Sequence, residues 1–113
     1  MRQAEDGRPS RAGPLAVIVS DTFGRPWREG LVDFALGVAG MEPLLDLRGT
    51  HDLGGRELHH TIHAQADALA AAAGLVMRKG AGIPVALVRG YEFTPADGSA
   101  RSLIRTPWMD LFR

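Results

Sequence analysis

The sequence contains no cysteine and almost no lysine, and each scarcity removes a class of function. Without cysteine, the 113-residue chain has no disulfide, no thiolate metal ligand and no cysteine nucleophile. Lys79 is the single lysine, and 13 basic side chains balance 13 acidic ones. A formal net charge of zero gives no broad basic surface for nucleic acid.

Long apolar runs and hydrolase motifs are also missing. No stretch reaches the roughly 20 apolar residues of a membrane span, and no signal peptide opens the chain. We therefore expect a cytoplasmic protein that binds neither membranes nor nucleic acid. There is no Gly-x-Ser-x-Gly motif, which makes a serine hydrolase a poor interpretation. The length allows a single domain with a modest core.

The most informative stretch is 17–30, where an apolar run ends in Ser-Asp-Thr. This pattern predicts a buried strand over 15–20, followed by a loop. The carboxylate of Asp21 beside the hydroxyl of Thr22 offers oxygen ligands to a hard cation such as Mg²⁺. Arg25 and Arg28 follow, and both can bind phosphate or carboxylate groups. An ordinary cap or Asx-turn accounts for the Asp-Thr pair equally well.

The rest of the chain predicts an α+β fold, with a mixed or antiparallel sheet and one main alanine-rich helix. Alternating large and small side chains predict a strand over 31–39, although a helical stripe also fits. The alanine-rich segment 64–77 predicts the main helix. Further strands are expected at 43–48, 57–62 and 84–89.

The two ends are expected to be less regular. Residues 1–13 are polar and predict a flexible arm. Residues 94–113 form a polar tail, in which a short helix over 100–105 is capped by Ser99 or Asp97.

Two further clusters have both a functional and a structural interpretation. The basic glycine loop 78–82 could hold phosphate through its amides and Lys79. However, it follows a helix C-terminus, where cations simply complement the dipole, and the Walker order of strand, loop and helix is absent. Four histidines lie at 51, 59, 60 and 63. Zinc needs three or four converging ligands, so solvated side chains are the better interpretation.

From Val17 to Gly90 the chain resembles the gamma-glutamyl ligases of deazaflavin coenzyme F420 biosynthesis. The resemblance rests on several motifs in the same order. They are Val-Ser-Asp-Thr-Phe-Gly-Arg-Pro-Trp-Arg-Glu-Gly at 19–30, Phe-Ala-Leu-Gly-Val-Ala-Gly at 34–40, Asp46, Asp-Leu-Gly-Gly-Arg-Glu-Leu at 52–58, the helix over 66–77 and Gly-Ile-Pro-Val-Ala-Leu-Val-Arg-Gly at 82–90. The tail over 97–113 also resembles actinobacterial members, in which a nitroreductase-like domain can continue.

The resemblance implies a GTP-dependent ligase. In this family the terminal carboxylate of the F420 precursor is activated as an acyl phosphate, and the amine of L-glutamate then attacks it. Mg²⁺ or Mn²⁺ is implied, with K⁺ as a further cation, and so is a homodimer. By motif, Asp21 and Thr22 match the metal-binding pair. The nucleotide-binding loop matches Met77, Arg78, Lys79, Gly80, Ala81, Gly82 and Ile83.

Two departures from the family pattern leave alternatives open. Lys79 stands where some members have a metal-binding glutamate, in a loop that is shorter here. Family members are also longer at the N-terminus, so residues 14–93 resemble only the C-terminal part of the ligase domain. One alternative is a non-catalytic, truncated ligase-like module for dimerisation or partner binding. Another is a small phosphate-binding α/β protein whose likeness to the ligases is convergent.

Overall fold

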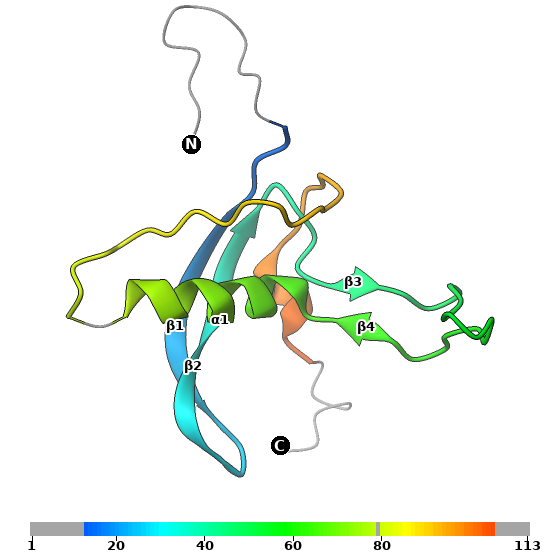
Figure 1. Ribbon diagram of the computed structural model, residues 1–113, viewed down its shortest axis with the longest axis horizontal. Coiled ribbons are helices and arrows are strands. Elements are labelled where there is room, and N and C mark those ends of the chain that lie inside the picture. The colour runs from blue at the N-terminus through cyan, green and yellow to red at the C-terminus, as the bar shows by residue number, and fades with distance from the viewer. Residues whose placement is uncertain (1–12, 79, 106–113) are drawn as a thin grey trace, which may run out of the picture.

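The described part of the chain forms two antiparallel hairpins, one α-helix and one short 3-10 helix. The computed structural model describes residues 13–78 and 80–105; the expected arm before Gly13 and the last part of the tail lie outside these ranges. The elements are β1 (Val17–Arg25), β2 (Arg28–Ala39), β3 (Leu45–Asp46), β4 (Ile62–His63), α1 (Gln65–Met77) and η1 (Ala100–Leu103) (Figure 1). The predicted α+β class, with antiparallel sheets and one main helix, is confirmed.

The β1–β2 hairpin is longer than the sequence predicted. β1 continues through Arg25 and β2 begins at Arg28, so that Pro26 and Trp27 alone form the turn. Trp27 has a φ of 59°, and proline followed by a positive φ is typical of a type II turn. The predicted loop after Ser20 was therefore wrong, because the glycine and proline signals mark the hairpin tip rather than the end of the strand.

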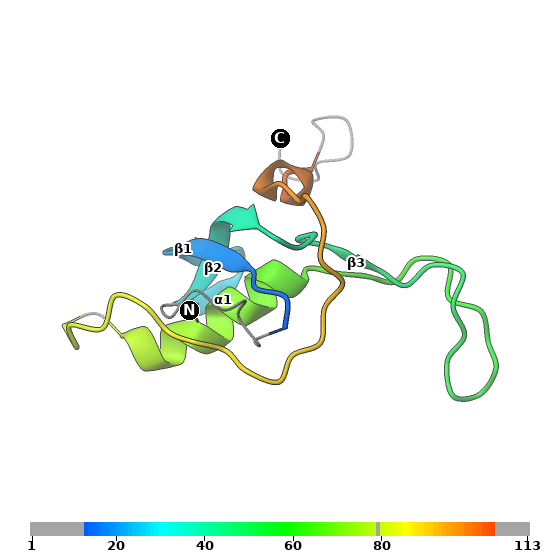
Figure 2. The same cartoon turned by 90° about the horizontal axis from the view of Figure 1, so that it is seen from above.

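The helix α1 packs against one face of the β1–β2 hairpin, while η1 contacts β2 from the other side (Figure 2). The Asp67 carboxylate of α1 accepts a hydrogen bond of 2.9 Å from the backbone N–H of Ala35 in β2. A Cβ atom added to Gly74 would lie 2.6 Å from Oδ2 of Asp33. Either the side chain of Asp33 or α1 itself would have to move to admit a side chain at position 74. The core around this contact is small and consists mainly of Ala35, Met41, Pro43, Ala66 and Ala70.

The second hairpin is mostly loop. Its ladder pairs Leu45 with His63 and Asp46 with Ile62, so the strands predicted over 43–48 and 57–62 are much shorter than expected. Turn bonds hold the remainder, including an N–H from Leu47 to the carbonyl of Thr61 at 2.9 Å. Figure 1 shows this hairpin extending away from α1 and the longer sheet.

The strand predicted over 84–89 is not formed among the described residues. These residues belong to no strand, and residues 83–89 make no backbone–backbone hydrogen bond within the described chain. The amino-acid pattern is typical of a buried strand, but no neighbouring strand supplies the hydrogen bonds.

The two predicted helices are present. The main helix begins at Gln65 and ends at Met77, within one residue of the prediction. The short helix is η1, and Ser99 caps it by accepting a hydrogen bond of 3.2 Å from the N–H of Arg101. Within the described ranges, no helix has the length and apolar character to cross a bilayer.

Candidate metal and nucleotide site

Asp21 and Thr22 lie in the middle of β1, and their side chains leave it on opposite faces. Asp21 pairs with Phe34 and Thr22 with Asp33 in the register of the hairpin. Successive side chains of a strand alternate between faces. Thr22 shares the face of Asp33, which packs at Gly74 of α1, whereas Asp21 lies on the opposite face. The expectation that both side chains emerge together at the end of a strand was wrong.

The carboxylate of Asp21 is exposed beside an aromatic pair. Its Oδ1 accepts a hydrogen bond of 2.8 Å from the N–H of Thr22. On the same face, the rings of Phe23 and Phe34 stack with centroids 5.9 Å apart. No group of three or more His, Asp and Glu side chains is placed to hold a metal within residues 13–78 and 80–105. Asp21 therefore offers oxygen ligands to a cation, but the described residues form no complete coordination shell.

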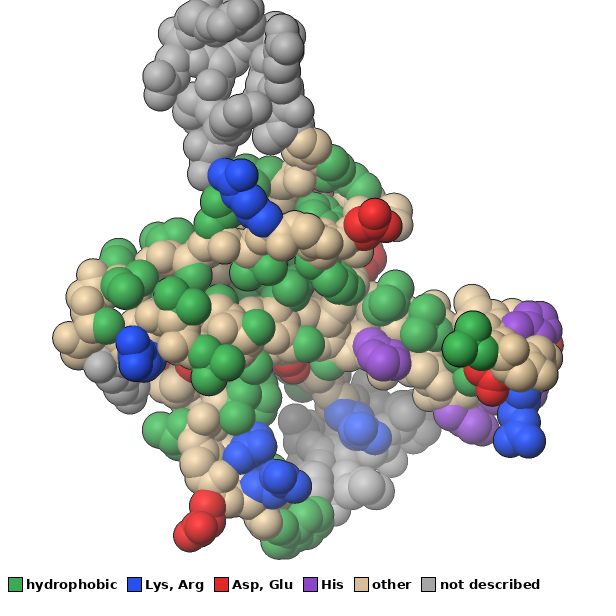
Figure 3. Space-filling model, in the orientation of Figure 1, with side chains coloured by type: hydrophobic (Ala, Val, Ile, Leu, Met, Phe, Trp, Pro, Cys, Tyr) green, Lys and Arg blue, Asp and Glu red, His purple; other side chains and the backbone are tan. Residues whose placement is uncertain are grey.

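Two arginines face each other at the tip of the same hairpin. Arg25 and Arg28 are cross-strand partners, and basic side chains gather over this end of the molecule (Figure 3). Nη2 of Arg25 donates to the carbonyl of Glu29 at 2.7 Å, while its buried Nε has no hydrogen-bond partner. Like charges directly opposite each other in a hairpin are unfavourable. An anion bound between these guanidinium groups would relieve the repulsion.

The glycine loop begins at the C-terminal end of α1. The N–H of Arg78 closes the helix on the carbonyl of Gly74 at 3.2 Å, and Ala81 donates to the carbonyl of Arg78 at 3.2 Å. Gly80 and Gly82 have φ values of 81° and 70°, which side-chain-bearing residues rarely adopt. Lys79 lies outside the described residues.

A cavity links the start of this loop to the strand that carries Asp21. Its volume is about 440 Å³, and its lining includes Met77 from α1 and Ser20 from β1. The first residue of the predicted nucleotide loop thus lies on the same cavity as the residue that precedes Asp21. The main chains of the two predicted segments therefore border one cavity on the α1 side of β1, whereas the carboxylate of Asp21 lies on the opposite face.

Sequence reasoning missed the polar residues that fix this region. Asp33 and Asp67 had no spacing that distinguished them from other acids, yet both lie at the interface between β2 and α1. The one available signal was Gly74, an isolated glycine in an alanine-rich helix, which often marks close packing. Gln65 donates to the carbonyl of Glu42 at 2.6 Å and accepts a hydrogen bond from the hydroxyl of Tyr91.

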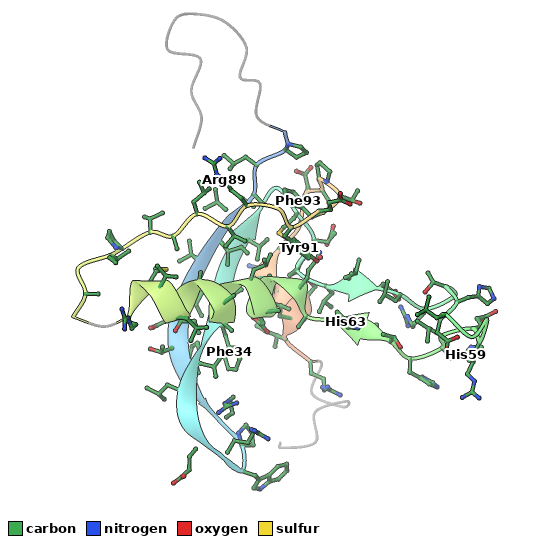
Figure 4. All side chains as sticks on the ribbon, in the orientation of Figure 1. Phe34, His59, His63, Arg89, Tyr91 and Phe93 are labelled. Carbon is green, nitrogen blue, oxygen red and sulfur yellow. The ribbon has the colours of Figure 1, made fainter. Side chains whose placement is uncertain are left out.

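The four histidines belong to no group of potential metal ligands among the residues that the structure describes. His59 lies on the extended hairpin, well away from Phe34 and the longer sheet (Figure 4). Its Nδ1 is 3.5 Å from Glu57, and its ring centroid is 6.4 Å from that of His60. Elsewhere on this hairpin, the Arg48 guanidinium hydrogen-bonds to Asp46 and lowers the pKa of that carboxyl to about 2.

Comparison with known proteins identifies this small α+β unit. The family model described as F420-0:Gamma-glutamyl ligase matches residues 12–90. The "Coenzyme F420:L-glutamate ligase" of Methanothermobacter thermautotrophicus is 50% identical over 102 residues, which cover 88% of this chain and 40% of that protein. Proteins of the same name from Methanocaldococcus jannaschii and Haloarcula marismortui are 46% and 47% identical, over 88% and 96% of this chain and 40% and 42% of their own lengths.

The chain is therefore a member of a ligase family. It belongs to the F420-0:gamma-glutamyl ligase family. It spans about 40% of the length of the relatives that it matches.

Proposed function

We propose that this chain contributes the metal- and nucleotide-contacting part of a coenzyme F420:L-glutamate ligase. The observation that carries the proposal is the family match over residues 12–90, which includes Asp21, Thr22 and the loop over 77–83. The cavity beside Ser20 and Met77 places the main chains of these segments near each other, although the carboxylate of Asp21 lies on the opposite face of β1.

The proposed reaction has two steps. The γ-phosphoryl group of GTP passes to a carboxylate of the F420 precursor, which yields an acyl phosphate and GDP. The amino group of L-glutamate then attacks the acyl carbon, phosphate leaves, and the amine proton is released as the amide forms. Arg25 and Arg28 are suited to hold a phosphate of the nucleotide or the precursor, because an anion offsets the repulsion between two like charges on cross-strand partners.

The proposed cation is Mg²⁺ or Mn²⁺, with K⁺ as a further candidate. When bound, the divalent ion would neutralise charge on the triphosphate. The exposed carboxylate of Asp21 offers the oxygen ligands that a hard cation prefers. Since the side chain of Thr22 lies on the opposite face, we assign Asp21 as the side-chain ligand and Thr22 as a contributor of its main-chain oxygen. The loop over 77–83 would contact the nucleotide through main-chain N–H groups other than those of Arg78 and Ala81, which are paired within the chain.

The test is glutamate addition by a two-part enzyme. The chain is mixed with a separate polypeptide that carries the part of the Methanothermobacter thermautotrophicus ligase outside the matched region, and the product is measured by mass spectrometry. We expect GTP- and Mn²⁺-dependent addition, reduced by about a hundredfold or more in Asp21→Asn because one metal ligand is weakened. Asp97→Asn, an exposed acid in the tail, is the matched control and should leave the rate unchanged.

Two results would redirect the proposal. Full activity of the Asp21→Asn mixture would remove the metal role of this residue. A complex that forms between the two polypeptides but adds no glutamate would favour the non-catalytic, partner-binding module.

A further inference from the structure

Residues 83–89 form an extended segment whose backbone has no hydrogen-bond partner within the described chain. The part over 84–89 reads Pro-Val-Ala-Leu-Val-Arg, and its β-branched and large apolar residues are typical of strands. Backbone N–H and C=O groups in a folded domain are nearly always paired with protein or water. This segment therefore has the composition and extension of a strand but lacks the sheet.

The side chains of this segment are exposed, although most are apolar. Val85 is 77% exposed and Leu87 is 60% exposed. The segment also forms one wall of the 440 Å³ cavity, whose other walls include Ile18 of β1 and Leu69 and Ala73 of α1. A strand that is apolar on both sides is typical of the interior of a sheet rather than of a solvated loop.

A second free edge lies on the same cavity. β1 pairs with β2 alone within the described residues, so its other edge has no strand beside it. Natural proteins protect such edges with charges, prolines, bulges or covering elements. Between Pro84 and Arg89 the segment has no charge, and Val17 and Val19 of β1 are exposed as well. Unprotected apolar edges of this kind indicate an interface.

We propose that residues 84–89 pair, strand to strand, with an extended apolar segment from the part of the ligase domain that this chain does not span. The family model matches residues 12–90 of this chain, and the chain covers 40% of the Methanothermobacter thermautotrophicus ligase. More than half of that ligase therefore lies outside the match and is available to supply the partner segment. Backbone pairing gives affinity in this kind of strand addition, and the apolar cavity selects the side chains. The proposal concerns assembly, and it holds whether or not GTP or a metal is used.

Amide hydrogen exchange, followed by mass spectrometry or NMR, tests this assembly. The chain is measured alone and mixed with the polypeptide that carries the unmatched part of the Methanothermobacter thermautotrophicus ligase. The amides of 85–89 should exchange freely in the chain alone and become slower by about a hundredfold or more in the mixture. The amides of β2 that pair with β1 report that the rest of the fold is intact in both samples.

Three outcomes would overturn the proposal. One is slow exchange at 85–89 in the chain alone, accompanied by the mass of a dimer, which would assign this edge to a second copy. Another is a complex in which these amides still exchange freely. The third is the absence of any complex.

Proline substitutions test the pairing separately from the catalytic reaction. Adjacent N–H groups of a strand point to opposite edges, so Leu87→Pro and Val88→Pro together remove a donor from each edge. At least one of them should weaken binding of the second polypeptide tenfold or more. Leu53→Pro is the control, because Leu53 is an exposed leucine in the turn that the N–H of Gly55 closes on the carbonyl of Asp52. Equal binding by both variants and the control would contradict strand pairing, whatever the activity of the mixture.

Discussion

Two regions of this molecule have similar, strand-like sequences, but only one of them forms a sheet within the described residues. β1 and β2 form a long antiparallel ladder, interrupted by two register shifts, that α1 covers on one face. Residues 84–89 are equally apolar and β-branched, yet they form no ladder within the described chain. The difference lies in the partner, since β1 meets β2 through a two-residue turn whereas the second segment has no strand beside it. In this molecule a strand forms where a neighbouring strand supplies hydrogen bonds, and a strand-like local sequence alone is not sufficient.

The largest expected contrast comes from proline at two matched alanines. Ala70→Pro should cost about 3 kcal/mol or more of unfolding free energy, because it removes a hydrogen bond inside α1 and its ring collides with the preceding turn. Ala86→Pro should change the stability little, since the N–H of Ala86 makes no hydrogen bond. Urea unfolding followed by circular dichroism measures both. A large loss for Ala86→Pro in the isolated chain would show that 84–89 is already paired.

The close contact between α1 and β2 gives the next largest effect. Gly74→Ala should destabilise the chain by about 1–3 kcal/mol through overpacking against Asp33, despite the better helix propensity of alanine. Gly24→Ala is the control, because a Cβ there meets nothing within 4 Å. The double variant Gly74→Ala/Asp33→Ala should recover part of the loss. Equal stability of Gly74→Ala and the original chain would place α1 farther from β2 than described.

A smaller effect is expected from the hydrogen bond between α1 and β2. Asp67→Ala leaves the N–H of Ala35 without its acceptor, which should cost about 1–2 kcal/mol. Asp67→Asn keeps an acceptor of similar shape and should cost less. Thermal unfolding of the two variants compares them directly, and equal losses would mean that the carboxylate acts through charge rather than through this hydrogen bond.

The smallest effect lies on the extended hairpin, outside both regions. The pKa of Asp46 is about 2, below its ordinary value of 3.8, because Arg48 hydrogen-bonds to the carboxylate. A lowered pKa means that the contribution to stability is present above about pH 4 and is lost as the pH falls towards 2. About half of each side chain of the pair is exposed to solvent, so salt should weaken it. An NMR titration should find the pKa of Asp46 higher in Arg48→Ala than in the original chain. An unchanged pKa would show that Arg48 does not interact with this carboxylate in solution.

The sequence predicted the elements whose signals are local. The alanine-rich composition located α1, and one of the two candidate caps, Ser99, is the residue that caps η1. The sequence-based prediction placed Asp21 and Thr22 in a loop, whereas both lie within β1. The prediction was wrong because pairing with β2, and not the residues that follow Ser20, sets the length of β1. The sequence predicted a strand at 84–89, because apolar alternation says nothing of whether a neighbouring strand exists.

The sequence proposes residues for the candidate site, but it does not predict their geometry. The motif resemblance selected Asp21 and the loop over 77–83. The alternation of β1, which separates the side chains of Asp21 and Thr22, and the contact of Asp33 with Gly74 depend on the register of the hairpin and the position of α1. Neither follows from spacing along the chain.

Paramagnetic broadening by Mn²⁺–GTP tests most directly whether Asp21 and the glycine loop serve one nucleotide-bound cation. In ¹⁵N-labelled chain, the account predicts that amide signals of Thr22 and of Gly80 and Gly82 broaden together at the lowest Mn²⁺–GTP concentrations, and that Asp21→Asn abolishes both effects. Broadening confined to the histidines of the extended hairpin, or to one of the two segments alone, would contradict a shared site.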